Sequence, residues 1–166
     1  MSTARNRRRV EKRLSRKRIE HALAHRSCGG CTECCTALGV TELGKPQWQP
    51  CPHATPDGCA IYADRPASCR QYNCTWRAGF AYTKERPDEV GIVVDVGVPN
   101  ADVGVTSMLV WRATQAGAAE RSAGLRQQLA AKGILCILIA QDGLRIITGP
   151  PDVIAKVQTC NEVSKP

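Results

Sequence analysis

The clearest hydrophobic pattern lies in the second half of the chain, where residues 90–157 contain 24 Val, Ile, Leu and Met residues. Short apolar runs bounded by turn residues predict four strands, at Val90–Val98, Gly104–Arg112, Ile134–Ala140 and Leu144–Thr148. Asp142-Gly143 separates the last two runs and is a hairpin signal. Because Ile134–Ala140 is continuously apolar, we expect it in the middle of a sheet.

Two segments with helical spacing alternate with these strands. The segment Gln115–Lys132 ends at Gly133, and its apolar face carries Ala118, Ser122, Leu125 and Leu129. A second helix would open at Pro151 and turn four residues inward, Val153, Ile154, Val157 and Cys160. The order β-β-α-β-β-α predicts an α+β layer with a mostly antiparallel sheet.

The stretch before this layer has a different pattern. Five prolines between residues 46 and 66 argue against long regular elements, and residues 28–80 hold only five strong aliphatic or Phe side chains. A segment this poor in apolar bulk cannot fold on hydrophobic burial alone, so bound metal would have to supply folding free energy. We therefore predict a basic arm at 1–27, an irregular metal-stapled module at 28–87 and an α+β domain at 88–166.

The charge of the chain is concentrated at its N-terminus. Residues 1–27 hold ten Lys or Arg and two Glu, a net charge of +8, whereas the other 139 residues sum to zero. Val10 and Leu14, and then Ile19 and Leu23, are spaced four apart, which predicts a weakly amphipathic cationic helix. Such an arm suits nucleic-acid or ribosomal phosphates or an anionic membrane surface, or else it is a solvated tail.

The length of the uncharged apolar runs indicates the cellular compartment that we expect for the protein. No run of 18 uncharged apolar residues occurs, so no membrane span is predicted, and no apolar region follows the basic start as a secretory signal requires. We therefore expect a cytoplasmic protein. In that reducing compartment, dense cysteines indicate metal ligands rather than disulfides.

Eight of the ten cysteines fall within 47 residues, and we predict all eight as metal ligands: Cys28, Cys31, Cys34, Cys35, Cys51, Cys59, Cys69 and Cys74. The first four form overlapping C-x-x-C units, where a tight turn points two thiolates at one metal. Gly29 and Gly30 suit that turn because glycine reaches positive φ without strain. Thiolate ligands favour zinc or iron over harder metals. Three arrangements stay open: two Cys₄ zinc sites, a 4Fe–4S cluster or a bridged polynuclear site.

Other polar side chains lie between the predicted ligands. Arg65 and Arg70 would offset the negative charge of a thiolate site by donating N–H groups to sulfur, which makes them cofactor-binding candidates. His53 could replace one thiolate. Cys136 and Cys160 lie in apolar patterns and are predicted to be small buried hydrophobes.

The downstream cysteines sit in a specific pattern: C-P at 51–52, G-C-x-I-Y at 58–62 and R-P-x-x-C-R-x-Y-x-C at 65–74. With the C-x-x-C-x-x-C-C run at 28–35, it resembles the YkgJ-type cysteine-cluster family of zinc- or iron-chelating domains. The resemblance spans residues 28–74 and implies metal chelation in a bacterial cytoplasm. A related module occurs in flagellin lysine methylases, so the family also hints at service to an enzyme.

These observations predict a metal-binding protein that chelates zinc or iron. Two alternatives stay open: an iron–sulfur-dependent redox or group-transfer enzyme associated with methyl transfer, and a zinc module that binds nucleic acid through residues 1–27. The sequence carries no phosphate-binding glycine loop, H-E-x-x-H or G-x-S-x-G motif. The catalytic residues therefore stay unknown from the sequence, and catalysis stays open.

Overall fold

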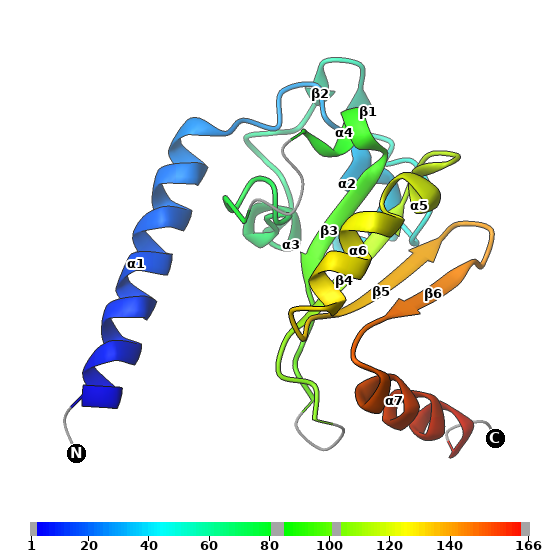
Figure 1. Ribbon diagram of the computed structural model, residues 1–166. Coiled ribbons are helices and arrows are strands. Elements are labelled where there is room, and N and C mark those ends of the chain that lie inside the picture. Colours follow the sequence, from blue (N-terminus) through cyan, green and yellow to red (C-terminus); the bar gives the residue numbers. More distant parts are fainter. Residues whose placement is uncertain (1–2, 81–84, 101–103, 164–166) are drawn as a thin grey trace.

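The structure is a computed structural model that describes residues 3–80, 85–100 and 104–163, with side chains described between residues 12 and 158 outside those gaps. Its elements in chain order are α1 (Thr3–His25), α2 (Glu33–Ala37), the 3₁₀ helix η1 (Thr41–Leu43), β1 (Ala54–Thr55), β2 (Gly58–Cys59), α3 (Ala67–Gln71), α4 (Pro87–Val90), β3 (Ile92–Val96), β4 (Met108–Ala113), α5 (Ala118–Arg121), α6 (Ala123–Ala130), β5 (Leu135–Ala140), β6 (Arg145–Thr148) and α7 (Pro151–Val163) (Figure 1).

A four-stranded sheet in the order β3-β4-β5-β6 forms the centre of the α+β half. The outer pairs β3/β4 and β5/β6 are antiparallel, and the inner pair β4/β5 is parallel. Parallel neighbours need a crossover connection, which α5 and α6 supply. The α+β class is confirmed, and β5 lies inside the sheet as its continuous apolar pattern predicts.

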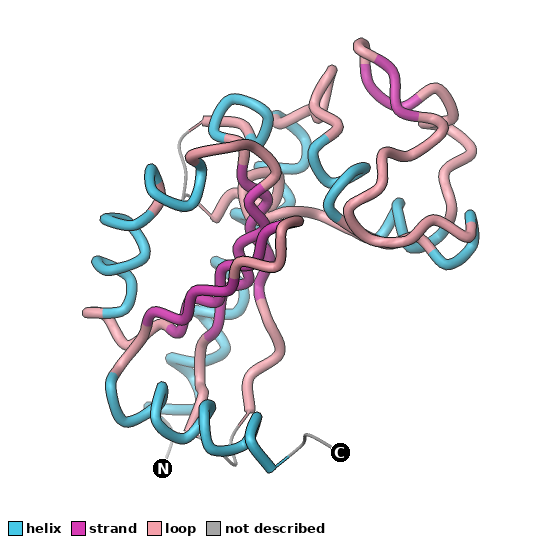
Figure 2. The backbone as a smooth tube through the Cα atoms, turned by 90° about the vertical axis from the view of Figure 1, so that its right-hand side faces the viewer, coloured by secondary structure: helices cyan, strands magenta, loops and turns pink. Residues whose placement is uncertain are grey.

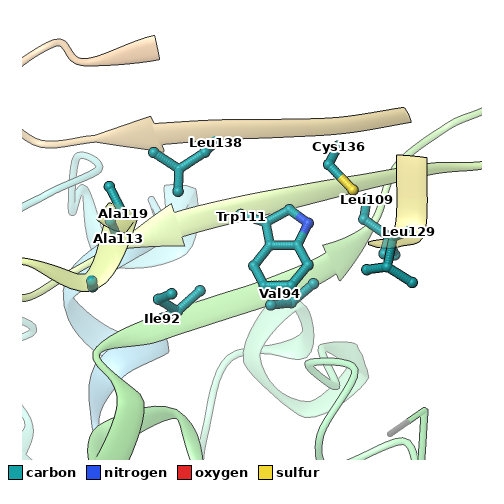
Figure 3. Close-up of a cluster of buried hydrophobic side chains, with 10 residues drawn as sticks. Ile92, Val94, Leu109, Trp111, Ala113, Ala119, Leu129, Cys136 and Leu138 are labelled. Carbon is teal, nitrogen blue, oxygen red and sulfur yellow. The ribbon is translucent and has the colours of Figure 1, made fainter. Parts of the chain in front are cut away.

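One face of the sheet packs against α5 and α6. Figure 3 shows Trp111 of β4 among side chains of β3, β5 and α6. Trp111 and Leu138 are fully buried, and Leu109 is 1% exposed. Alternate residues of β4 are buried because successive side chains of a strand point to opposite faces.

The other face of the sheet is shared between two partners. Leu135 and Ile137 of β5 pack beneath α7 with Val153, Ile154 and Val157. At β3 the same face meets the cysteine module, where Val93 lines a small pocket with cysteines. At the outer edge of β3 the Thr75 N–H donates to the Val94 carbonyl at 2.8 Å. The inward direction predicted for Cys160 falls outside the described side chains.

Several predicted boundaries are corrected by the structure. The helix expected over 115–132 is two helices, because the Ser122 hydroxyl at 3.0 Å and Arg126 Nη2 at 2.9 Å both donate to the Ala119 carbonyl and compete with the backbone ladder. The strand expected from Val90 begins at Ile92, after α4 ends at Gly91 with a φ of +69°. The strand expected from Gly104 begins at Met108. The predicted turn at Asp142-Gly143 is present, and Gly143 has a φ of +88°.

Residues 3–25 form one continuous helix, α1, which projects away from the sheet (Figure 1). Figure 2 shows the same backbone turned by 90°, with the strands in magenta. Its last turns contact the segment after α3. Ala22 is buried, and a Cβ added at Gly79 would lie 2.6 Å from the Ala22 Cβ. The Arg26 guanidinium stacks over the Trp76 ring at 5.2 Å. Leu14, predicted on an apolar stripe, is 62% exposed, and the Val10 side chain lies outside the described ones.

Candidate metal centre

The predicted ligands come from five short pieces of backbone. Cys28 and Cys31 flank a tight turn in which the Cys31 N–H donates to the Cys28 carbonyl at 2.9 Å. Gly29 in this turn has a φ of +51°, as predicted, whereas Gly30 is not among the glycines with positive φ. Glycine at 30 is favoured for another reason, because a Cβ there would lie 2.9 Å from the Pro56 carbonyl oxygen. The other six thiols are carried by α2, the β1–β2 hairpin, α3 and the adjoining loops: Cys34, Cys35, Cys51, Cys59, Cys69 and Cys74.

Seven of the eight thiols line one open cavity of about 450 Å³. They are Cys28, Cys31, Cys34, Cys35, Cys51, Cys59 and Cys69. The remaining wall is largely apolar and includes Leu38, Val40 and Ile61. The folding of these distant segments therefore brings nearly all the predicted ligands to one place.

Cys74 lies on the other side of the same thiols. It lines a small neighbouring pocket of about 20 Å³ together with Cys28, Cys31 and Cys34. Val93 of β3 closes this pocket from the sheet side. These three cysteines thus separate the large cavity from Cys74 and reach both spaces.

The adjacent thiols of α2 form a hydrogen-bonded pair. The hydrogen bond from Cys34 lowers the pKa of Cys35 to about 7, and the positive charges of Lys45 and Arg65 add to this effect against burial. The same bond, together with burial, raises the pKa of Cys34. Burial raises the pKa of Cys31 to about 12. These effects therefore favour the protonated form of Cys31 and Cys34, whereas the bond from Cys34 and two nearby cations favour the thiolate of Cys35.

Lys45 is a buried cation in the cavity wall that sequence reasoning missed. Its side chain is 6% exposed, and Nζ donates to the carbonyls of Leu38, Pro46 (3.0 Å) and Thr36 (3.4 Å). Burial lowers the pKa of Lys45, and the charges of nearby thiols such as Cys51 act in the opposite direction. A lone lysine in a proline-rich loop gives no sequence signal for burial, so only the fold reveals this charge.

The two arginines predicted beside the site have different positions. Arg65 lines the cavity, its Nε donates to the Tyr62 carbonyl at 2.9 Å, and its guanidinium stacks 3.6 Å from the centre of the Tyr62 ring. Arg70 is exposed, does not line the cavity, and donates to the Arg65 carbonyl. His53 is also absent from the cavity lining.

Tyr72 connects the cavity wall to the sheet, and sequence reasoning missed this connection as well. Its hydroxyl donates to one carboxylate oxygen of Asp95 on β3, and Arg112 on β4 donates to the other. Val93 faces Arg112 in the strand register, so Asp95 and Arg112 are diagonal neighbours on one sheet face. Burial raises the pKa of Tyr72, so its hydroxyl keeps the proton that it donates to Asp95.

The thiols surround the cavity without meeting at one point. Within the described residues, no group of three or more His, Cys, Asp or Glu side chains is placed to hold a single metal ion. The chemistry of the donor set nevertheless fits zinc or iron, because thiolates are the preferred ligands of both. A single zinc ion is contacted directly by four sulfurs at about 2.3 Å, which leaves no open space around the ion. Cavities near 450 Å³ instead fall in the range that holds small ligands, roughly 300–1,000 Å³.

The two cysteines outside the cluster are not part of this arrangement. Cys136 on β5 is fully buried in the sheet core, as predicted. The side chain of Cys160 lies outside the described ones. No helix among the described residues is both long enough and apolar enough to cross a membrane.

Comparisons with known proteins add no relative to this picture. No family model, no curated protein and no solved structure matches the chain. The functional argument therefore rests on the site itself.

Proposed function

We propose that this protein binds zinc or iron through its cysteine cluster, and that the bound group is polynuclear. One observation carries the proposal: seven thiols from separate segments line a single cavity. Metal ligation is the chemistry that thiols at this density serve in a reducing compartment. Membership of the YkgJ-type family would agree with this function and stays a prediction.

The size of the cavity supports a polynuclear metal group rather than a single metal ion. Within the described residues no three thiols are placed to hold one tetrahedral ion, and the cavity that seven of them line has a volume of about 450 Å³. Cys34 and Cys35 are adjacent on α2, and two neighbouring side chains more easily serve two metal ions than one tetrahedral centre. An iron–sulfur cluster or a thiolate-bridged zinc cluster would satisfy both observations.

The positive charges around the cavity favour a bound metal–thiolate group with a net negative charge. A Cys₄ zinc site and a thiolate-bound 4Fe–4S cluster each carry a net charge of −2. Lys45 is buried in the wall and Arg65 lies beside it, so two cations face the thiols. A buried positive charge is costly unless a negative charge compensates it. The bound metal–thiolate group would supply that compensation.

The test is anaerobic purification followed by metal and acid-labile sulfide analysis and an absorption spectrum. We expect more than one zinc or iron per chain. An iron–sulfur cluster would give a brown protein with labile sulfide, and zinc a colourless one. A single metal ion per chain would contradict the polynuclear assignment, and a chain without stoichiometric zinc or iron would contradict metal binding itself.

A matched pair of variants tests the ligand assignment. Cys34→Ala removes a thiol that lines both pockets, so we expect it to lower bound metal. Cys136→Ala removes a thiol that is buried in the sheet core, so we expect full metal content. Equal metal loss in the two variants would show that general destabilisation, and not ligation, controls metal content.

The alternative of an iron–sulfur-dependent enzyme stays a hypothesis. An open cavity with an apolar wall could admit a small molecule beside a cluster. A redox-active cluster in the absorption spectrum would favour this hypothesis, and a colourless zinc protein would remove it.

A further inference from the structure

The cationic residues of α1 are concentrated on one side of the helix. Residues 5–18 contain nine Lys or Arg and a single acidic residue, Glu11. At about 100° per residue, seven of the nine basic positions fall within one half of the helix circumference. These seven positions are Arg5, Arg8, Arg9, Lys12, Arg13, Arg16 and Lys17.

From Lys12 onward, where the side chains are described, the cationic face of α1 lies opposite the side that touches the rest of the protein. The helix touches the body through the opposite side, where Ala22 is buried and the Arg18 carbonyl lies 3.6 Å from the Cβ position at Gly79. From Lys12 to Arg18 every side chain is exposed. Arg16 makes an exposed ion pair with Glu20 at 2.8 Å, and such a pair costs little to open. The described cationic side chains, from Lys12 to Lys17, are therefore free to meet a partner.

The composition of the helix argues against a membrane surface as that partner. An interfacial helix buries a continuous apolar face in the lipid. Between residues 5 and 18, Val10 and Leu14 are the only Val, Leu, Ile, Met or aromatic residues, and Lys17 and Arg7 flank them around the helix. A helix with so little apolar surface binds through charge, which favours a densely anionic polymer.

We propose that α1 binds the major groove of duplex DNA through phosphate contacts. The major groove is about 12 Å wide and admits one α-helix, with phosphates along both walls. Basic positions spread over half the helix circumference can reach both walls. The major groove of A-form RNA is too deep and narrow for this approach. Lys and Arg at these seven positions supply phosphate contacts, which fix the position and orientation of the helix on the duplex.

The test measures binding of the full-length, metal-loaded protein to a fluorescent 20-base-pair DNA duplex over a salt series. About seven phosphate contacts predict that affinity falls by about 10³–10⁴-fold between 50 and 200 mM salt. A duplex RNA of the same length and vesicles of anionic phospholipid are measured in parallel. We expect weaker binding to both.

Two charge-matched variants locate the contact. The Lys12→Gln, Arg13→Gln double variant removes two exposed positions of the cationic face, and it should reduce the salt slope by about 1.8. The Lys132→Gln, Arg145→Gln double variant removes two exposed cations from the sheet half, and it should leave the slope unchanged.

Three other outcomes would each overturn the proposal that α1 binds duplex DNA. Absence of DNA binding at 50 mM salt would leave α1 without this partner. Equal loss of slope in the two variants would show that net charge, and not α1, drives binding. Tighter binding to duplex RNA or to vesicles would assign the helix to that partner instead. Metal analysis of the same samples keeps each of these results separate from the metal-binding proposal.

Discussion

The folds of the sheet half and of the cysteine module are stabilised by different interactions. Among the described residues, 13 hydrophobic side chains between residues 88 and 166 are buried, including Trp111 and Leu138. Between residues 28 and 87 only three are, namely Ala37, Val40 and Ala78, and none of them is large. The sheet half thus has a core that folds by hydrophobic burial, and the module does not.

The module nevertheless has defined local geometry. Its turns are fixed by backbone hydrogen bonds and by glycines that no other residue replaces easily. At Gly58, for example, φ is +124° and an added Cβ would lie 2.5 Å from the Gly29 carbonyl oxygen. Two separate loops therefore cross at close range beside the thiols. The comparison teaches that this module is shaped around its cysteines rather than around apolar side chains.

Metal removal is expected to produce the largest difference between the two regions. If metal closes the module, then chelation under reducing conditions should unfold residues 28–80 and leave the sheet half folded. Limited proteolysis with mass spectrometry should then give a stable fragment that begins near residue 88. Loss of the whole chain in one cooperative step would show instead that the two regions share one folding unit.

A buried aromatic residue should matter far more in the sheet half than an aromatic residue in the module. Trp111 is fully buried, so Trp111→Ala should lower the free energy of unfolding by about 3–5 kcal/mol. Tyr62 is 45% exposed at the rim of the cavity, so Tyr62→Ala should cost no more than about 1 kcal/mol. Urea denaturation followed by circular dichroism compares the two variants. Similar losses would contradict the division of roles.

The stability of the cysteine module should depend on a buried charge, Lys45, more than the stability of the sheet half depends on an exposed one. Lys45→Met leaves buried carbonyls without their donor and removes a cation from the thiol cavity, so we expect a loss of about 1–3 kcal/mol. We also expect faster transfer of metal to a chelator, because one compensating charge is gone. Lys132→Met, at an exposed site in the sheet half, is the control. Unchanged transfer rates in Lys45→Met would remove Lys45 from the metal site.

The contact between the regions should have a smaller, measurable energy. Tyr72→Phe removes the hydroxyl that donates to Asp95, while Arg112 still pairs with that carboxylate. We expect a loss of about 1–2 kcal/mol. A double-mutant cycle with Asp95→Asn should show non-additive losses. Additive losses would mean that this contact does not couple the module to the sheet.

The smallest expected effect is at the buried thiol of the sheet. Cys136→Ala removes one small side chain from a packed core and should cost about 1 kcal/mol with no change in metal content. Differential scanning calorimetry and elemental analysis of the same sample measure both quantities. Lost metal in this variant would place Cys136 among the ligands.

Much of the fold was predictable because its signals are local. The apolar runs around Leu109 and Leu138, the turn at Asp142-Gly143 and the helix opened by Pro151 are each specified by neighbouring residues. The break at Ser122 was not, because the two side chains that bond the Ala119 carbonyl, Ser122 and Arg126, give too weak a sequence signal against a helical apolar pattern.

The order of amino acids is enough to identify the residue types that carry the chemistry: eight clustered cysteines, a cationic helix and an apolar half. That seven thiols share one cavity while Cys74 faces another, and that Lys45 is buried beside them, follows from the folded arrangement. So does the contact of Tyr72 with Asp95 across 23 residues of sequence. The physical reason is that burial, charge compensation and hydrogen-bond partners are set by segments distant in the chain, which no local pattern records.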